Sequence, residues 1–114
     1  MRDYRPRRCS VRWLDKDCPS EVLAILDNKG KTFDRYTVIY NDLSLYNGEH
    51  WLWYRGMSEH PSDPQGFGIS ADMKAYQVAE YRYRCKHQYA KWSSLPDDVK
   101  SVVIADCKAI RNSA

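Results

Sequence analysis

At 114 residues, the chain is long enough for one domain with a single modest core. Hydrophobic residues make up 43% and charged residues 29%, a composition that excludes an intrinsically disordered chain, and the net charge is only +3. Because no segment has the roughly 18 apolar residues of a membrane span and no apolar run follows the N-terminus, we expect a soluble cytoplasmic protein without a membrane partner.

The first predicted element is a basic stretch. Residues 1–14 contain five arginines and a single aspartate, and Pro6 disfavours a helix there. We interpret residues 1–18 as a basic N-terminal arm and residues 19–114 as one α+β domain.

Three strands are predicted next. The segment "EVLAIL" from Glu21 is short enough for a strand or a helix, and we favour a strand because "DNKGKT" behind it suits a hairpin turn. Residues 36–40 alternate as a strand does, and Asn47 with Gly48 predicts a second turn. The segment "HWLWYRGM" at residues 50–57 then gives a third strand, so the sequence predicts an antiparallel meander.

The segment "GMSEHPSDPQGFG" at residues 56–68 holds three glycines and two prolines. Glycine permits sharp turns and proline stiffens the chain, while Phe67 is a candidate apolar anchor. We favour a compact corner over a presented binding loop.

Helices are expected to cover the sheet. Ser70 is a candidate N-cap for a helix over residues 71–79, whereas the alternating tyrosines and arginines in residues 80–90 leave helix and strand both open. Near the C-terminus, Ser94 is a candidate cap, with Pro96 and two aspartates in the first turn. Positions in helical order follow at Val99, Val102, Val103, Asp106 and Ile110. The expected fold is α+β, an antiparallel sheet of three or more strands packed by one or two helices, including a C-terminal helix.

The cysteines at positions 9, 18, 85 and 107 lack the close pairs of a zinc ribbon. With no secretory signal we expect free thiols, and we expect no metal or cofactor. A zinc site made by Cys85 and His87 with Cys9 or Cys18 stays open as an alternative.

Charge is banded along the chain. Residues 74–91 contain five basic residues and one acid, whereas residues 15–73 contain ten acids and five bases. Tyrosines interleaved with cations in "EYRYRCKHQY" are typical of single-strand nucleic-acid grooves, in which bases stack and phosphates pair. An ordinary solvated face is the alternative. The candidate contacts to DNA or RNA are Arg5, Arg7, Arg8, Arg82, Arg84 and Lys86.

No catalytic motif is present. Ser58, His60 and Asp63 lie within one irregular segment without a nucleophile elbow or an oxyanion-hole pattern, and "NKGKT" lacks the earlier glycine of a P-loop. We therefore assign no catalytic residues and expect a protein that is not an enzyme.

Three phrases carry a resemblance: "ILDNKGKTFDRYTVIY", "YRGMSEHPSDPQGFG" and "KWSSLPDDVKSVV". Over roughly residues 22–106 the chain resembles a group of small uncharacterised proteins of bacteriophages and related mobile elements, although it has one glycine in "NKGKT" where a pair is expected. The resemblance implies a phage protein that acts in the host cytoplasm by stoichiometric binding, most simply as an anti-CRISPR-like inhibitor of a host defence protein or nucleoprotein complex. Direct nucleic-acid binding is the alternative.

A basic partner would be contacted by acidic and aromatic side chains of the middle band. The candidates are Asp15, Asp17, Glu49, Trp51, Trp53, Glu59 and Asp63.

Overall fold

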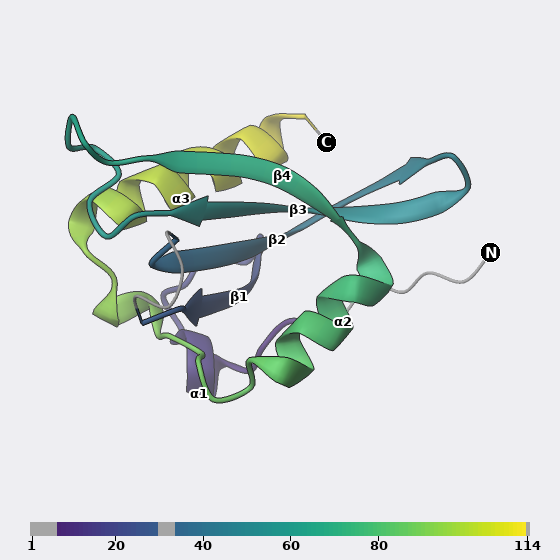
Figure 1. Ribbon diagram of the computed structural model, residues 1–114, viewed down its shortest axis with the longest axis horizontal. Helices are drawn as coiled ribbons and strands as arrows, with labels where there is room; N and C mark the ends of the chain where they lie inside the picture. The colour runs from purple at the N-terminus through teal and green to yellow at the C-terminus, as the bar shows by residue number, and fades with distance from the viewer. Residues whose placement is uncertain (1–6, 30–33, 114) are drawn as a thin grey trace.

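The computed structural model describes residues 7–29 and 34–113. In chain order the elements are α1 (Val11–Leu14), β1 (Val22–Asp27), β2 (Tyr36–Tyr46), β3 (Glu49–Met57), β4 (Gly68–Lys74), α2 (Ala75–Arg84), a 3-10 turn (Trp92–Ser94) and α3 (Asp97–Asn112). The four strands form one antiparallel sheet whose spatial order follows the chain order (Figure 1). The expected α+β class with a C-terminal helix is confirmed.

The three predicted strands are present. "EVLAIL" forms β1 and not a helix, because its backbone pairs with β2 from Val22↔Tyr40 to Asp27↔Tyr36. Asn47 and Gly48 have φ values of 52° and 75°, the positive values that a two-residue hairpin turn requires. The predicted turn "DNKGKT" spans residues 27–32, in which Lys29 has a positive φ of 53° and residues 30–32 lie outside the described ranges.

The helix predicted over residues 71–79 is wrong in its first half. Strand β4 runs to Lys74 and pairs with residues 51–57 of β3, and Ser70 lies in it opposite Arg55 instead of capping a helix. Pairing satisfies the backbone groups of β3, so this non-local gain outweighs the local cap signal. Helix α2 begins only at Ala75 and runs to Arg84, so the alternating tyrosines and arginines up to Arg84 are helical.

Helix α3 confirms the C-terminal prediction with a shifted start. Pro96 occupies the N-cap position, and Ser94 belongs to the preceding 3-10 turn instead of capping the helix. The two aspartates fall in the first turn, where the helix dipole favours anions. Val99 and Val103 are fully buried, so the apolar stripe closes the core as expected.

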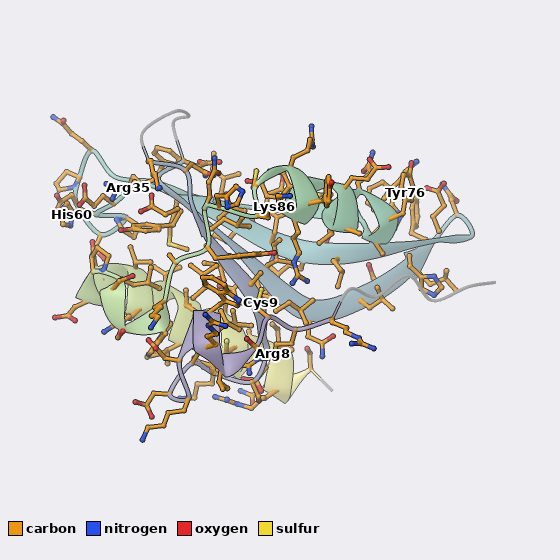
Figure 2. All side chains as sticks on the ribbon, turned by 90° about the horizontal axis from the view of Figure 1, so that it is seen from below. Arg8, Cys9, Arg35, His60, Tyr76 and Lys86 are labelled. Carbon is orange, nitrogen blue, oxygen red and sulfur yellow. The ribbon has the colours of Figure 1, made fainter. Side chains whose placement is uncertain are left out.

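Helices α2 and α3 lie on opposite sides of the sheet (Figure 2). Strand β1 and the first half of β2 are buried on both of their faces, since residues 22–26 and 36–40 are all buried. The distal parts of β2 and β3 project beyond the rest of the molecule (Figure 1) and expose Leu45 and Tyr46. The core therefore sits between the helices at the β1 side of the sheet.

The described part of the predicted arm packs against this core. The Cys9 amide donates to the Leu23 carbonyl at 2.8 Å, which extends the outer edge of β1. Cys9, Leu14 and Cys18 are all buried in the core. Residues 7–18 therefore share the hydrophobic core of the sheet and helices.

The loop between β3 and β4 is compact. The Ser58 amide donates to the Phe67 carbonyl at 3.0 Å, and the Phe67 amide donates to Ser58 Oγ at 3.1 Å. A Cβ added to Gly66 would lie 2.0 Å from the His60 carbonyl oxygen, so the chain folds tightly back on itself here. Phe67 is half-buried. These contacts fit the corner interpretation.

Candidate functional site

The outer face of α2 carries the exposed cations and tyrosine of the basic band. Helical geometry separates Tyr81, which is half-buried and donates to Asn28 Oδ1 at 3.4 Å, from Tyr83, which is 72% exposed. Tyr83 shares a shallow hollow with Arg7 and Lys86, and a neighbouring hollow with Arg84. We define Arg7, Tyr83, Arg84 and Lys86 as the α2 surface.

The cations of this surface remain available to a ligand. Lys86 Nζ lies 4.8 Å from the centroid of the Tyr83 ring, a cation–π contact at an exposed site. Within the described ranges, neither Arg7, Arg84 nor Lys86 forms a salt bridge. In Figure 2, Lys86 and Tyr76 lie on the α2 side of the sheet, whereas Arg8 lies near α1.

Arg82 differs from its neighbour Arg84. Its guanidinium donates to the Arg7 carbonyl through Nη1, to Tyr89 Oη at 3.1 Å through Nε, and to Cys9 Sγ at 3.0 Å through Nη2. Arg82 therefore ties α2 to the N-terminal segment and is not free to bind phosphate in this arrangement.

Arg8 is also engaged within the fold. Its Nε donates to the Val22 carbonyl at 2.8 Å, and its Nη2 donates to the carbonyls of Cys18 and Pro19, both at 3.1 Å. The side chain thus satisfies three carbonyl groups around the turn before β1. Among the six predicted nucleic-acid contacts, Arg5 lies outside the described residues. Arg8 and Arg82 are engaged within the fold, and the remaining three belong to the α2 surface: Arg7, Arg84 and Lys86.

The residues predicted to meet a basic partner do not converge. Glu49 in β3 pairs with Lys74 at 3.0 Å. Glu59 and Asp63 are exposed in the loop between β3 and β4, and the Glu59 carboxylate lies 3.5 Å from the Arg35 guanidinium. Asp17 is exposed beside α1.

Asp15 helps to hold the turn at Trp92–Ser94. Its Oδ2 accepts a hydrogen bond from the Ser93 amide at 2.9 Å. Hydrogen bonding by the Ser93 side chain, and then by its backbone amide, lowers the pKa of the Asp15 carboxyl below its ordinary value. Asp15 therefore lies in a different place from the acids of the β3–β4 loop.

The two predicted tryptophans belong to β3 and differ in their surroundings. Trp53 stacks on Tyr40 with a centroid distance of 4.8 Å, so much of its ring is part of the packing under α3. Trp51 lies under Lys74, whose Nζ is 5.6 Å from its ring centroid, and its Nε1 is buried without a hydrogen-bond partner among the described residues.

Sequence reasoning missed a buried ionic network between β3 and α3. Arg55 donates to both carboxylate oxygens of Asp106, at 2.6 and 3.0 Å, and Tyr40 Oη donates to Asp106 Oδ2 at 2.7 Å. Burial and the neighbouring carboxylate raise the pKa of Tyr40 far above its ordinary value. The signal was an aspartate inside the apolar stripe of α3, which requires a buried partner.

A second missed cluster joins the ends of β1 and β2. Asn28 Nδ2 donates to the Asp34 carbonyl at 2.9 Å and to Thr37 Oγ1 at 3.0 Å. Arg35 Nε donates to Asp27 Oδ1 at 2.7 Å. Desolvation raises the pKa of the Asp27 carboxyl, but the hydrogen bonds from Arg35 and from the Lys29 amide outweigh it, so the pKa lies below its ordinary value. These contacts hold the hairpin in register.

All four cysteines are free thiols. Burial raises the pKa of Cys18 to about 11 and that of Cys107 to about 12, so both are protonated at neutral pH. Cys85 is half-buried and His87 is exposed. Across residues 7–29 and 34–113, no three His, Cys, Asp or Glu side chains are grouped as metal ligands.

In the described part of the chain, no helix is long and apolar enough to cross a membrane. Comparisons with known protein families, curated proteins and solved structures gave no match.

Proposed function

We propose that this chain is a small binding protein that contacts single-stranded DNA or RNA through the α2 surface. The observation that carries the proposal is the exposed ring of Tyr83 beside Arg7, Arg84 and Lys86, none of which forms a salt bridge in the described residues, although Glu80 also lines the hollow of Tyr83 and Arg84. Aromatic rings bordered by cations bind single strands without requiring a base sequence.

Each side chain has a defined part in this contact. A base stacks on Tyr83, while the guanidinium of Arg84 and the ammonium of Lys86 pair with phosphates on either side of it. Arg82 contributes indirectly, because its bonds to the Arg7 carbonyl and to Tyr89 fix the N-terminal segment against α2. Of the contacts predicted from the sequence, the assignment therefore keeps Arg7, Arg84 and Lys86 as phosphate ligands and drops Arg8 and Arg82, which are engaged within the fold.

The test is fluorescence anisotropy with a labelled single-stranded oligonucleotide. Replacing Arg84→Ala with Lys86→Ala is expected to weaken binding about tenfold and to lower the slope of log K against log salt by about 1.4, the value for two lost phosphate contacts. Tyr83→Ala is expected to weaken binding at least about fivefold with little change in that slope.

A matched control removes two exposed lysines elsewhere, Lys16→Ala with Lys108→Ala. This control changes the net charge by the same amount, so it measures the effect of long-range attraction alone. Equal weakening by both double variants would refute a binding site on α2.

Inhibition of a host defence complex is the second candidate. It is supported by the resemblance to bacteriophage proteins and by the distribution of charge, because Asp17, Glu59 and Asp63 are exposed on elements other than α2. In this role the protein works in the host cytoplasm, with one surface on the nucleic acid of an anti-CRISPR-type target and another on its protein.

Two measurements separate the candidates. Pull-down from host lysate with and without nuclease asks whether capture of a complex depends on nucleic acid. Titration of the purified complex then asks whether its activity falls to an end point at equal molar amounts. Capture that survives nuclease together with that end point supports the inhibitor, whereas loss of every partner after nuclease supports direct nucleic-acid binding.

A further inference from the structure

A hollow of about 270 Å³ lies on the α3 side of the sheet, where β2, β3 and β4 meet the last turn of α3. We call it the Trp53 hollow. Its walls include Asp42, Ser44, Trp53 and Asp72. The volume is below the roughly 300–1,000 Å³ of pockets for drug-sized ligands, so it fits the end of a side chain better than a larger molecule.

An irregular strand pairing creates this hollow. Ile39 pairs with Tyr54 and Leu43 pairs with Leu52, so β2 has two more residues than β3 between these pairs. The extra residues lie opposite Trp53 and include Asp42. Such bulges bend a strand and redirect its side chains, often beside a binding site. On the other side of β3, Asp72 pairs directly with Trp53.

The Trp53 ring is a fixed wall of the hollow. It stacks on Tyr40, whose hydroxyl is held by Asp106. Arg55 lies with its guanidinium carbon 5.7 Å from the Trp53 ring centroid, but its charge is paired with Asp106 through two hydrogen bonds. The neighbouring cation is therefore committed to another carboxylate.

The charge of the hollow is negative. Asp42 and Asp72 are exposed, and neither side-chain carboxylate forms a hydrogen bond or ion pair with another residue of the described ranges. The C-terminal end of α3 adds the negative end of its helix dipole. Two unpaired carboxylates, a helix C-terminus and an aromatic wall together favour a cation.

We propose that the Trp53 hollow binds an arginine side chain presented by a protein partner. A guanidinium is planar and can lie against the part of Trp53 that lines the hollow while its N–H groups reach Asp42 and Asp72, a combination that a compact ammonium does not offer. The hollow lies across the sheet from the α2 surface, so this site is independent of the proposed nucleic-acid contact.

The test follows the indole N–H resonance of Trp53 by NMR during titration with an end-blocked peptide, Gly-Ser-Arg-Ser-Gly. The arginine peptide is expected to shift this resonance saturably, and the same peptide with citrulline, which keeps the shape without the charge, is expected to leave it in place. A lysine peptide is expected to bind at least severalfold more weakly.

Matched variants separate the hollow from general attraction. Asp42→Asn with Asp72→Asn keeps side-chain size and is expected to weaken the arginine peptide at least about tenfold. Asp17→Asn with Asp63→Asn, which changes the same charge at exposed positions elsewhere, is expected to leave the affinity within about twofold. The spectra of both variants also show whether the fold is retained.

Three results would overturn the proposal. The first would be an equal loss of affinity in the control variant and the hollow variant. The second would be a citrulline peptide that binds as well as the arginine peptide, and the third would be free guanidinium that binds as tightly as the peptide. The last result would indicate a small-cation site instead of a protein docking site. Oligonucleotide affinity is measured in parallel, so a failure of the α2 surface is distinguished from a failure of the hollow.

Discussion

The two sides of the sheet use charged residues in different ways. On the α3 side, Arg55 and Asp106 form an ion pair within the fold, whereas on the α2 side, Arg82 donates to neutral acceptors around Cys9 and Tyr89. Each side also has charges that are not used inside the fold, carboxylates in the Trp53 hollow and cations on the α2 surface. Charges that look equivalent in the sequence are therefore candidates for a binding surface only where the fold leaves them unpaired.

The largest change in the free energy of unfolding is expected from a substitution on the α3 side of the sheet. Asp106→Ala leaves the guanidinium of Arg55 without its anion and Tyr40 without its acceptor, so the free energy of unfolding is expected to fall by about 3 kcal/mol. Urea denaturation followed by tryptophan fluorescence measures this change. Asp97→Ala, in the exposed first turn of the same helix, is expected to cost less than about 1 kcal/mol. Similar losses for the two variants would contradict a structural role for the network.

The α2 side is expected to be less sensitive. Arg82→Ala removes bonds to the Arg7 carbonyl, Tyr89 and Cys9, and is expected to lower the free energy of unfolding by about 1–2 kcal/mol. Arg84→Ala should change it by less than about 0.5 kcal/mol, because Arg84 is exposed. Urea denaturation of the two single variants tests this contrast, and a larger loss for Arg84→Ala would reverse our assignment of the two arginines.

The reactivity of the cysteine thiols is expected to differ less strongly between the two sides of the sheet. Cys107 on α3 is buried, and Cys85 after α2 is half-buried. At pH 8 a thiol reagent is therefore expected to modify Cys85 in the native protein well before Cys107. Mass spectrometry of partly labelled protein identifies the order. Earlier labelling of Cys107 would mean that α3 opens more readily than its packing indicates.

The burial of Cys18 and Cys107 makes the free energy of unfolding depend on pH. The folded pKa values of about 11 for Cys18 and about 12 for Cys107 lie above the unfolded value of about 8.5, so the unfolded chain releases these protons first. Stability from the two thiols is fully present below about pH 8.5 and is lost as pH rises through the folded values. Urea denaturation at pH 8 and pH 10 should show a decrease that is smaller in Cys107→Ala, and an equal decrease would exclude a contribution from Cys107.

Local sequence signals predicted most of the fold. Alternation in residues 36–40, the turn residues Asn47 and Gly48, and the stripe through Val99 and Val103 each depend on near neighbours in the chain. The start of α2 could not be found in this way, because residues 71–74 extend in order to pair with β3. That pairing depends on a strand distant in the sequence.

The residues of the two proposed binding sites were harder to predict for the same reason. Arg82 and Arg84 are equivalent in the sequence, and only the arrival of the chain around Cys9, far away in sequence, distinguishes them. Asp42 and Asp72 had no local pattern at all, since the Trp53 hollow depends on an irregular register and on where α3 ends.

The most direct test of the nucleic-acid proposal is an NMR titration of the uniformly labelled protein with a short single-stranded oligonucleotide. We expect amide shifts at Arg7 and along residues 79–87, with the Trp53 indole resonance unchanged. Shifts that instead gather on the α3 side, or their absence at oligonucleotide concentrations that saturate anisotropy, would contradict the assignment of nucleic-acid binding to the α2 surface.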